Sequence, residues 1–222
     1  VSNGKLLGIQ DAPNGLKTWT WRQSLPVSTY LISFVAGEYT AKMDTWRNIP
    51  MTYNVPRGME DTIDSTFSHT KQMLDFFSDR FGVPYPWDQY AQTAVHDFTA
   101  AGMENVSATT LAARDMIHAD LAGERAEAAD GLISHELTHQ WFGDLVTCKD
   151  WTNTWLNEGF ATFGANLWEE HFYGADAAAY RYWRDQNNWM SSKELFAIPI
   201  VTRDIDDSVE YVGNVYDKAG WV

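Results

Sequence analysis

The stretch His135-Glu136-Leu137-Thr138-His139 decides how the rest of this 222-residue chain is interpreted. It falls inside a segment, 124–142, whose pattern predicts a helix that ends at Gly143. Residues four apart lie on the same face of a helix, so both imidazoles can reach one metal ion. Glu136 points elsewhere around the helix, beside the ion, where its carboxylate can act on a water molecule. The five residues therefore predict a metal site.

A third ligand is expected from Glu158. This residue lies 19 positions after His139 and early in the next predicted helix, 154–172. A turn between two antiparallel helices would bring its carboxylate back over the histidines. Two His and one Glu form a catalytic zinc set that leaves one coordination position for water. We therefore expect one Zn²⁺ per chain. Glu169 and Glu170 also lie downstream of the histidines, but we expect them at a solvated helix end rather than as ligands.

Strands come first in the chain and helices follow. Residues 1–57 predict strands: 18–21 and 51–55 alternate polar with apolar or aromatic residues, and 29–35 is rich in β-branched and aromatic residues. Residues 89–97 predict one more strand. The remaining periodic segments predict four helices, over 60–81, 124–142, 154–172 and 176–189. This order indicates an α+β fold. We expect a β-rich domain remnant at 1–57 and a catalytic domain at 58–222, truncated at its C-terminal side.

Composition excludes several classes of protein. Asp and Glu outnumber Lys and Arg by 30 to 16, which gives a net charge of −14 and no electrostatic basis for nucleic-acid binding. The single cysteine, Cys148, excludes an intramolecular disulfide, and no apolar run predicts a membrane-spanning segment. The chain opens on Val1 rather than Met, so we expect a piece of a longer protein. Its compartment and oligomeric state stay open.

Aromatic residues are frequent around the predicted metal helix and its successor. Stripes at helical spacing are more typical of packing than of a binding pocket. We therefore expect six of them in the core: Trp141, Phe142, Trp151, Trp155, Phe160 and Phe163.

Two further segments, taken with the metal-binding trio, resemble the gluzincin aminopeptidases, the family of aminopeptidase N and leukotriene hydrolase. Ala101-Gly102-Met103-Glu104-Asn105 resembles the family's Gly-Ala-Met-Glu-Asn exopeptidase motif. Val215-Tyr216-Asp217-Lys218 resembles its Tyr-Glu-Lys-Gly segment. The resemblance implies a thermolysin-like zinc metallopeptidase catalytic domain, preceded by the end of a β-rich N-terminal domain.

The resemblance also implies an activity and a role for individual residues. It implies a zinc aminopeptidase that acts on peptides with a free amino terminus, with Glu136 and Tyr216 as catalytic residues. The phenolic O–H of Tyr216 would stabilise the oxyanion. Glu104 would bind the substrate's α-ammonium group, and Gly102 and Met103 would line the first pocket.

Two positions depart from the family pattern, and three alternatives stay open. Ala101 and Ala219 stand where the family usually has glycine, which would strain a backbone that needs positive φ. The alternatives are an epoxide hydrolase of the leukotriene-hydrolase type, a non-catalytic scaffold and an endopeptidase. The complete trio argues against a scaffold, and Glu104 argues against an endopeptidase. With segments of the cleft missing, we expect weak or no activity from this chain alone.

Overall fold

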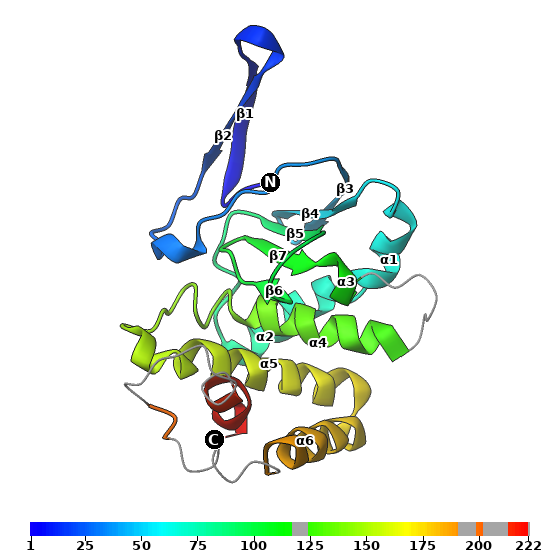
Figure 1. Ribbon diagram of the computed structural model, residues 1–222, viewed down its shortest axis with the longest axis vertical. Coiled ribbons are helices and arrows are strands. Elements are labelled where there is room, and N and C mark those ends of the chain that lie inside the picture. Colours follow the sequence, from blue (N-terminus) through cyan, green and yellow to red (C-terminus); the bar gives the residue numbers. More distant parts are fainter. Residues whose placement is uncertain (117–123, 191–198, 202–212, 222) are drawn as a thin grey trace. The chain divides into compact units, whose positions relative to one another are not determined.

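Figure 1 shows the computed structural model, which describes residues 1–116, 124–190, 199–201 and 213–221. The chain divides into two compact units. The first comprises residues 1–71 and 85–129, and the second comprises residues 72–84 and 130–222. Helices α2 (Thr70–Phe81) and α4 (Glu124–Thr138) each contribute residues to both units. The proposed division at residues 57 and 58 stays a prediction.

A five-stranded sheet belongs to the first unit, with the strand order β3-β4-β5-β7-β6. The strands are β3 (Tyr39–Trp46), β4 (Ile49–Pro56), β5 (Tyr90–Val95), β6 (Gly102–Met103) and β7 (Ala108–Ala112). The central strands β4, β5 and β7 are parallel, whereas β3 and β6 pair antiparallel at the two edges. Every residue of β5 and β7 is buried, as expected for parallel strands covered on both faces.

A hairpin precedes this sheet in the chain. Strands β1 (Lys5–Asp11) and β2 (Lys17–Arg22) pair antiparallel, with a register shift between Leu6 and Gly8. Residues 1–57 thus contain four strands and no α-helix, which confirms the β-rich prediction. The strand expected over 29–35 is wrong, because a 3₁₀ turn occupies Thr29–Leu31 and only an isolated bridge follows at Phe34. The strand predicted over 89–97 is also confirmed as β5, but β6 and β7 were not predicted.

The single helix predicted over 60–81 is wrong. The structure has two helices, α1 (Ile63–Thr66) and α2, separated by a turn at residues 67–69. Phe67 leaves the helical conformation, with φ −108° and ψ 19°, and its ring stacks on Tyr53 of β4 at 5.1 Å between centroids. The contact with the sheet therefore prevails over helical continuity. Gly82 follows α2 with φ +68° and ends it as predicted.

The second unit is helical. It holds the end of α4, then α5 (Trp155–Tyr173) and α6 (Ala175–Met190), and two short turns at Asn214–Lys218 and Ala219–Trp221. The α5 prediction is confirmed to within one residue at each end, and Gly174 with φ +95° follows it. Strands followed by helices confirm the α+β class. Among the described residues, no helix has the length and apolarity required to cross a bilayer.

The core of the second unit is aromatic. Helix α2 buries Phe77, whose ring lies 6.3 Å from that of Trp141, and Phe81 lies 5.6 Å from the same indole. Of the six aromatics expected in the core, only Trp141 is fully buried, and Phe142 and Trp155 are half-buried. The prediction is wrong for the exposed ones, Trp151, Phe160 and Phe163. Helical spacing identifies residues that share a face, but it does not say whether that face meets the core.

Candidate metal centre

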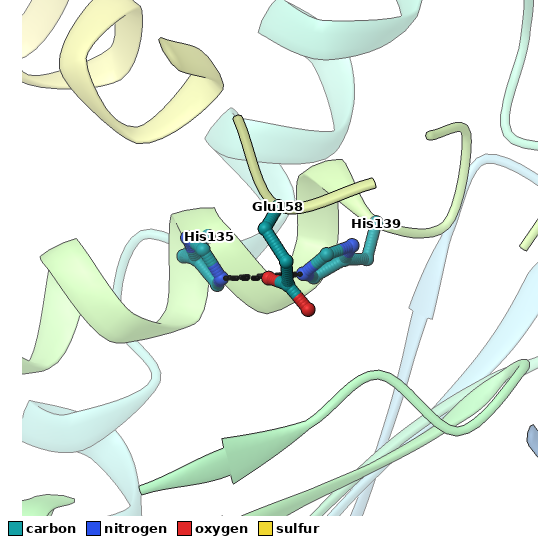
Figure 2. A group of neighbouring side chains, drawn as sticks. All are labelled: His135, His139 and Glu158. Carbon is teal, nitrogen blue, oxygen red and sulfur yellow. Dashed lines mark hydrogen bonds and ion pairs between the residues drawn. The ribbon is translucent and has the colours of Figure 1, made fainter. Parts of the chain in front are cut away.

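Three donor atoms converge between α4 and α5 in the second unit. His139 Nε2 lies 3.2 Å from His135 Nε2 and 3.1 Å from Glu158 Oε2, and His135 Nε2 lies 3.4 Å from the same carboxylate oxygen. Figure 2 shows the Glu158 side chain, from the first turn of α5, directed between the two imidazoles of α4. The predicted trio is thus brought together by a helix, a loop and a second helix.

The spacing of these atoms fits a tetrahedral ion. Zinc lies about 2.0–2.1 Å from nitrogen and oxygen ligands, so two ligand atoms at tetrahedral positions are about 3.3–3.4 Å apart. The three donor–donor distances of 3.1, 3.2 and 3.4 Å are close to that value. All three side chains are nearly enclosed, with exposed fractions of 16% for His135, 1% for His139 and 12% for Glu158. The residues present therefore fit one ion of this kind.

The orientation of His139 is set by a backbone carbonyl. Its Nδ1 lies 2.9 Å from the carbonyl oxygen of Phe142. A carbonyl can only accept, so Nδ1 carries the proton and Nε2 presents its lone pair to the other two donors. This is the tautomer that a metal ligand requires.

The same turn explains why α4 ends at Thr138 rather than at residue 142. The amides of Trp141 and Phe142 both donate to the carbonyl of Thr138, at 3.0 and 3.1 Å, so the chain tightens instead of continuing the helix. Gly143 follows with φ +123°, a conformation that favours glycine. The turn carries the Phe142 carbonyl back to the imidazole of His139. The predicted helix end was therefore four residues too late.

Electrostatics favour the ligand forms of the trio. Burial lowers the pKa of His135, and the carboxylate of Glu158 only partly opposes this shift. Burial alone would raise the pKa of Glu158, but His139 and His135 outweigh it and hold that pKa well below its usual range. The first shift favours the neutral imidazole of His135, and the second favours the ionised carboxylate of Glu158. Those are the protonation states in which these groups bind a metal.

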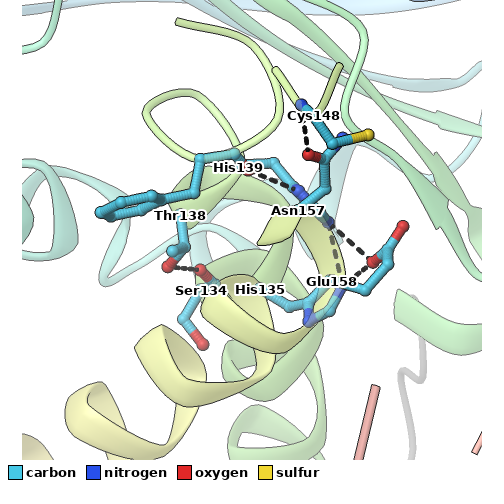
Figure 3. Close-up of polar contacts among 8 residues, drawn as sticks. Ser134, His135, Thr138, His139, Cys148, Asn157 and Glu158 are labelled. Carbon is cyan, nitrogen blue, oxygen red and sulfur yellow. Dashed lines mark hydrogen bonds and ion pairs between the residues drawn. The ribbon is translucent and has the colours of Figure 1, made fainter. Parts of the chain in front are cut away.

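Close contacts fix α4 against α5. The Thr138 hydroxyl donates to the Ser134 carbonyl at 2.7 Å (Figure 3), which turns the side chain along its own helix. A Cβ on Gly164 of α5 would lie only 2.2 Å from Thr138 Oγ1, so the helices touch where one side chain is absent. Just before Glu158, the Asn157 amide oxygen accepts the Cys148 N–H at 3.1 Å. Sequence reasoning missed these three supports.

The predicted catalytic residues Glu136 and Tyr216 also lie in the second unit. Glu136 is buried on α4, one residue after His135. Tyr216 lies in a π-helical turn at Asn214–Lys218, and its ring is nearly parallel to that of His135, with centroids 5.8 Å apart and an interplanar angle of 14°. Ala219 has φ −70° and ψ −27°, so its methyl group causes no backbone strain.

The predicted substrate-binding residues lie in the first unit. Gly102 and Met103 form the edge strand β6, which pairs with Leu111 and Thr110 of β7, and Glu104 follows it and is buried. Ala101 does not have a positive φ. The structure thus gathers the trio and Tyr216 in one unit and describes residues 102–104 within the other.

One expectation about α5 was wrong. Glu169 is buried and forms an ion pair with Arg181 of α6, whereas Glu170 is exposed as expected. Close by, the Tyr173 hydroxyl donates to the buried Asp130 of α4 at 2.8 Å. A sequence signal for the ion pair existed, because the stop at Gly174 implies two antiparallel helices with facing side chains.

Comparison with known proteins gives consistent matches. Residues 65–218 match the Peptidase family M1 domain. Glutamyl aminopeptidase of Rattus norvegicus is 34% identical over 174 residues, which is 77% of this chain and 18% of that protein. Aminopeptidase 2 of Candida albicans is 38% identical over 150 residues, or 66% of this chain and 16% of that protein. Aminopeptidase N of Streptomyces lividans is 30% identical over 151 residues. The chain thus spans less than a fifth of the length of the curated relatives it matches.

Proposed function

This chain belongs to peptidase family M1, and from that membership we propose that it hydrolyses the N-terminal peptide bond of peptides with the help of one zinc ion. The observation that carries the proposal is the triangle of donor atoms from His135, His139 and Glu158. The donor–donor distances are close to those of a tetrahedral zinc site. The protonation states favoured for His135 and Glu158 are those in which such groups bind a metal. The names of the relatives, all aminopeptidases, support the reaction class.

In this proposal the proton transfers belong to Glu136. A bound zinc ion would lower the pKa of a water molecule to about 7 and polarise the substrate carbonyl. Glu136 lies one residue after His135, about 100° further around α4, and so its carboxylate is beside the site rather than among the ligands. It accepts the proton of the attacking water and later delivers it to the leaving amine.

Tyr216 is proposed to stabilise the oxyanion. Its ring lies against the ring of His135, which keeps the phenol next to the trio. The phenolic O–H can donate to an oxygen that becomes negative during attack on the carbonyl. A donor that is already in place needs no rearrangement at the moment of reaction, which is the reason such groups accelerate it.

Recognition of the free amino terminus is proposed for Glu104, with Gly102 and Met103 lining the first pocket. A buried carboxylate pairs favourably with an α-ammonium group through a charge-assisted hydrogen bond. An internal segment of a peptide lacks that charge and would leave the carboxylate without its counter-ion. This preference is what separates an exopeptidase from an endopeptidase.

Metal content is the first test. We expect elemental analysis of the purified chain to give near one zinc per chain, and we expect Glu158→Ala to lose it while Glu170→Ala keeps it. Glu170 is the matched control because it lies on the same helix and is exposed. A folded wild-type chain without zinc would contradict the proposal and favour a scaffold.

Substrate class is tested on the zinc-loaded chain. We expect slow but measurable cleavage of an amino-acid anilide with a free amino group, in keeping with the weak activity expected of this chain. Cleavage of the N-acetyl analogue should be at least about 100-fold slower still, because the acetyl group removes the charge that Glu104 would bind. Equal rates would contradict exopeptidase recognition. Opening of a fatty epoxide without anilide cleavage would favour the leukotriene-hydrolase alternative.

A further inference from the structure

Residues 213–221 pack onto α5 through two glycines. A Cβ on Gly159 of α5 would lie 2.6 Å from the Ala219 Cβ and 3.0 Å from its carbonyl carbon. A Cβ on Gly220 would lie 2.8 Å from Cγ2 of Thr162, one turn along the same helix. Atoms of this kind do not approach so closely, and backbone cannot swing aside as a flexible side chain does. The contact therefore depends on both missing side chains.

Tyr216 lies in the turn that leads into this contact. The tyrosine precedes Ala219 by three residues, in the turn whose last amide, that of Ala219, donates to the carbonyls of Asn214 and Tyr216. At the other end of the turn, Asn214 is fully buried and its amide donates to the Pro199 carbonyl at 2.7 Å. The turn is thus fixed at both ends, with the ring of Tyr216 against His135 between them.

We propose that Gly159 is a positioning residue for the reaction: its missing side chain lets residues 219–220 dock on α5, and this docking places Tyr216 beside the metal-binding trio. The docking is inferred from geometry alone. Its effect on catalysis rests on the proposed function. Glu158 and Gly159 are consecutive and point about 100° apart around one turn of α5. A single helical turn therefore supplies a donor of the trio and the surface that holds Tyr216.

Ala219 contributes the side chain that lies nearest to the Cβ position of Gly159. Its methyl group is the nearest atom to the missing Gly159 side chain, and its helical backbone would accept glycine equally well. The two positions therefore share one small space. A methyl group at 159 should be partly compensated by removing the methyl group at 219, and such coupling is what a double-mutant cycle measures.

The docking is tested by amide hydrogen exchange of residues 213–221 in the zinc-loaded chain. We expect Gly159→Ala to speed exchange there by about tenfold or more, with zinc still near one per chain. The double variant Gly159→Ala/Ala219→Gly should recover part of the protection. Gly8→Ala is the control, because a Cβ there meets no atom within 4 Å, and it should change nothing in this segment.

A second variant keeps the test decisive if Gly159→Ala disturbs α5 itself. Gly220→Ala enlarges the contact from the other side and leaves α5 unaltered, so it must produce the same faster exchange. Unchanged exchange in both variants would overturn the inference. The inference would also be overturned if both variants, Gly220→Ala included, lost zinc and lost exchange protection throughout α5. Both glycines would then be needed only for folding.

The catalytic consequence has its own readout. We expect Gly159→Ala to lower kcat by about tenfold with KM nearly unchanged, and to add no further loss in a Tyr216→Phe background, because both variants remove the same donor. Additive losses would contradict action through Tyr216. A zinc-loaded wild type that cleaves no peptide would contradict the proposed function, and the exchange measurement would still decide the docking.

Discussion

At the scale of single residues, Gly143 contributes no donor atom to the metal centre, but its backbone conformation affects how the imidazole of His139 is oriented. Its φ of +123° lies in the region that favours glycine, and a Cβ there would lie 2.9 Å from Nδ1 of His139. The same nitrogen donates to the carbonyl of Phe142, so the glycine turn and the histidine orientation are one arrangement. Changing the turn should alter the direction in which Nε2 presents its lone pair.

We expect Gly143→Ala to weaken zinc affinity by about 10- to 100-fold, the range found when a group that orients a metal ligand is changed. It should also lower the free energy of unfolding by about 1 kcal/mol or more through backbone strain. Gly174→Ala is the matched control, because Gly174 has φ +95° but no atom within 4 Å of its Cβ position. Chelator competition and thermal unfolding distinguish the two. Equal zinc affinity in both variants would contradict the role assigned to the turn.

The donors themselves could be predicted from sequence, but the group that orients them could not. His135, His139 and Glu158 are recognisable because only a few side chains bind zinc and helical spacing brings two of them to one face. The partner of His139 is a backbone carbonyl, and every residue has one. Nothing in the sequence around Phe142 distinguishes its carbonyl from any other. Only the structure of the turn shows that this carbonyl orients His139.

At the scale of elements, the crossing of α4 and α5 holds the trio together. The helices approach closely where Gly164 faces Thr138, and a methyl group on Gly164 would lie 2.2 Å from Oγ1 and 2.5 Å from Cγ2 of Thr138. Overpacking such a contact forces the elements apart. Because α4 carries both histidines and α5 carries Glu158, any separation also moves the donors.

We expect Gly164→Ala to lower the free energy of unfolding by about 1–3 kcal/mol and to weaken zinc binding at the same time. The double variant Gly164→Ala/Thr138→Ala should recover part of both losses, since it removes the two closest atoms. Urea unfolding with and without zinc measures the stability, and chelator competition measures the affinity. Full zinc affinity in the single variant would show that the crossing does not set the donor spacing.

Helices were more predictable than strands, and their interiors more than their ends. The interiors of α2 and α6 are strongly amphipathic, an apolar repeat that sequence shows directly, whereas that repeat is weak in α4 and α5. The break at Phe67 and the early end of α4 depend on contacts with Tyr53 and with His139 that lie outside the repeat. Strands β6 and β7 are only two and five residues long, and β7 is buried on both faces, so neither shows alternation.

At the scale of the whole molecule, the donors are confined to one of the two units. His135, His139 and Glu158 all belong to the second unit, although α4 begins in the first. An ion bound by them would link α4 to α5 and add no link to the sheet. The stabilisation that a bound metal provides increases with the ratio of the metal concentration to the dissociation constant. It acts on the segments that the metal joins.

Removal of the metal should therefore loosen the chain unevenly. We expect a chelator to lower the thermal midpoint and to speed amide exchange at residues 130–138 and 155–173, while exchange in β5 and β7 stays unchanged. Exchange measured by mass spectrometry with and without chelator checks this, and excess zinc should reverse it. Equal loss of protection in the sheet would mean that the two units unfold as one.

The helix–loop–helix origin of the three donors has a consequence for how the protein folds. Closing a loop costs entropy that grows with its length, and His139 and Glu158 are only 19 positions apart in the chain. The contacts of this site therefore join residues that are close in sequence. The pairing of β4 with β5, in contrast, joins strands separated by intervening helices. We therefore expect the metal centre to form early in folding, because all three of its donors are present once α5 has been synthesised.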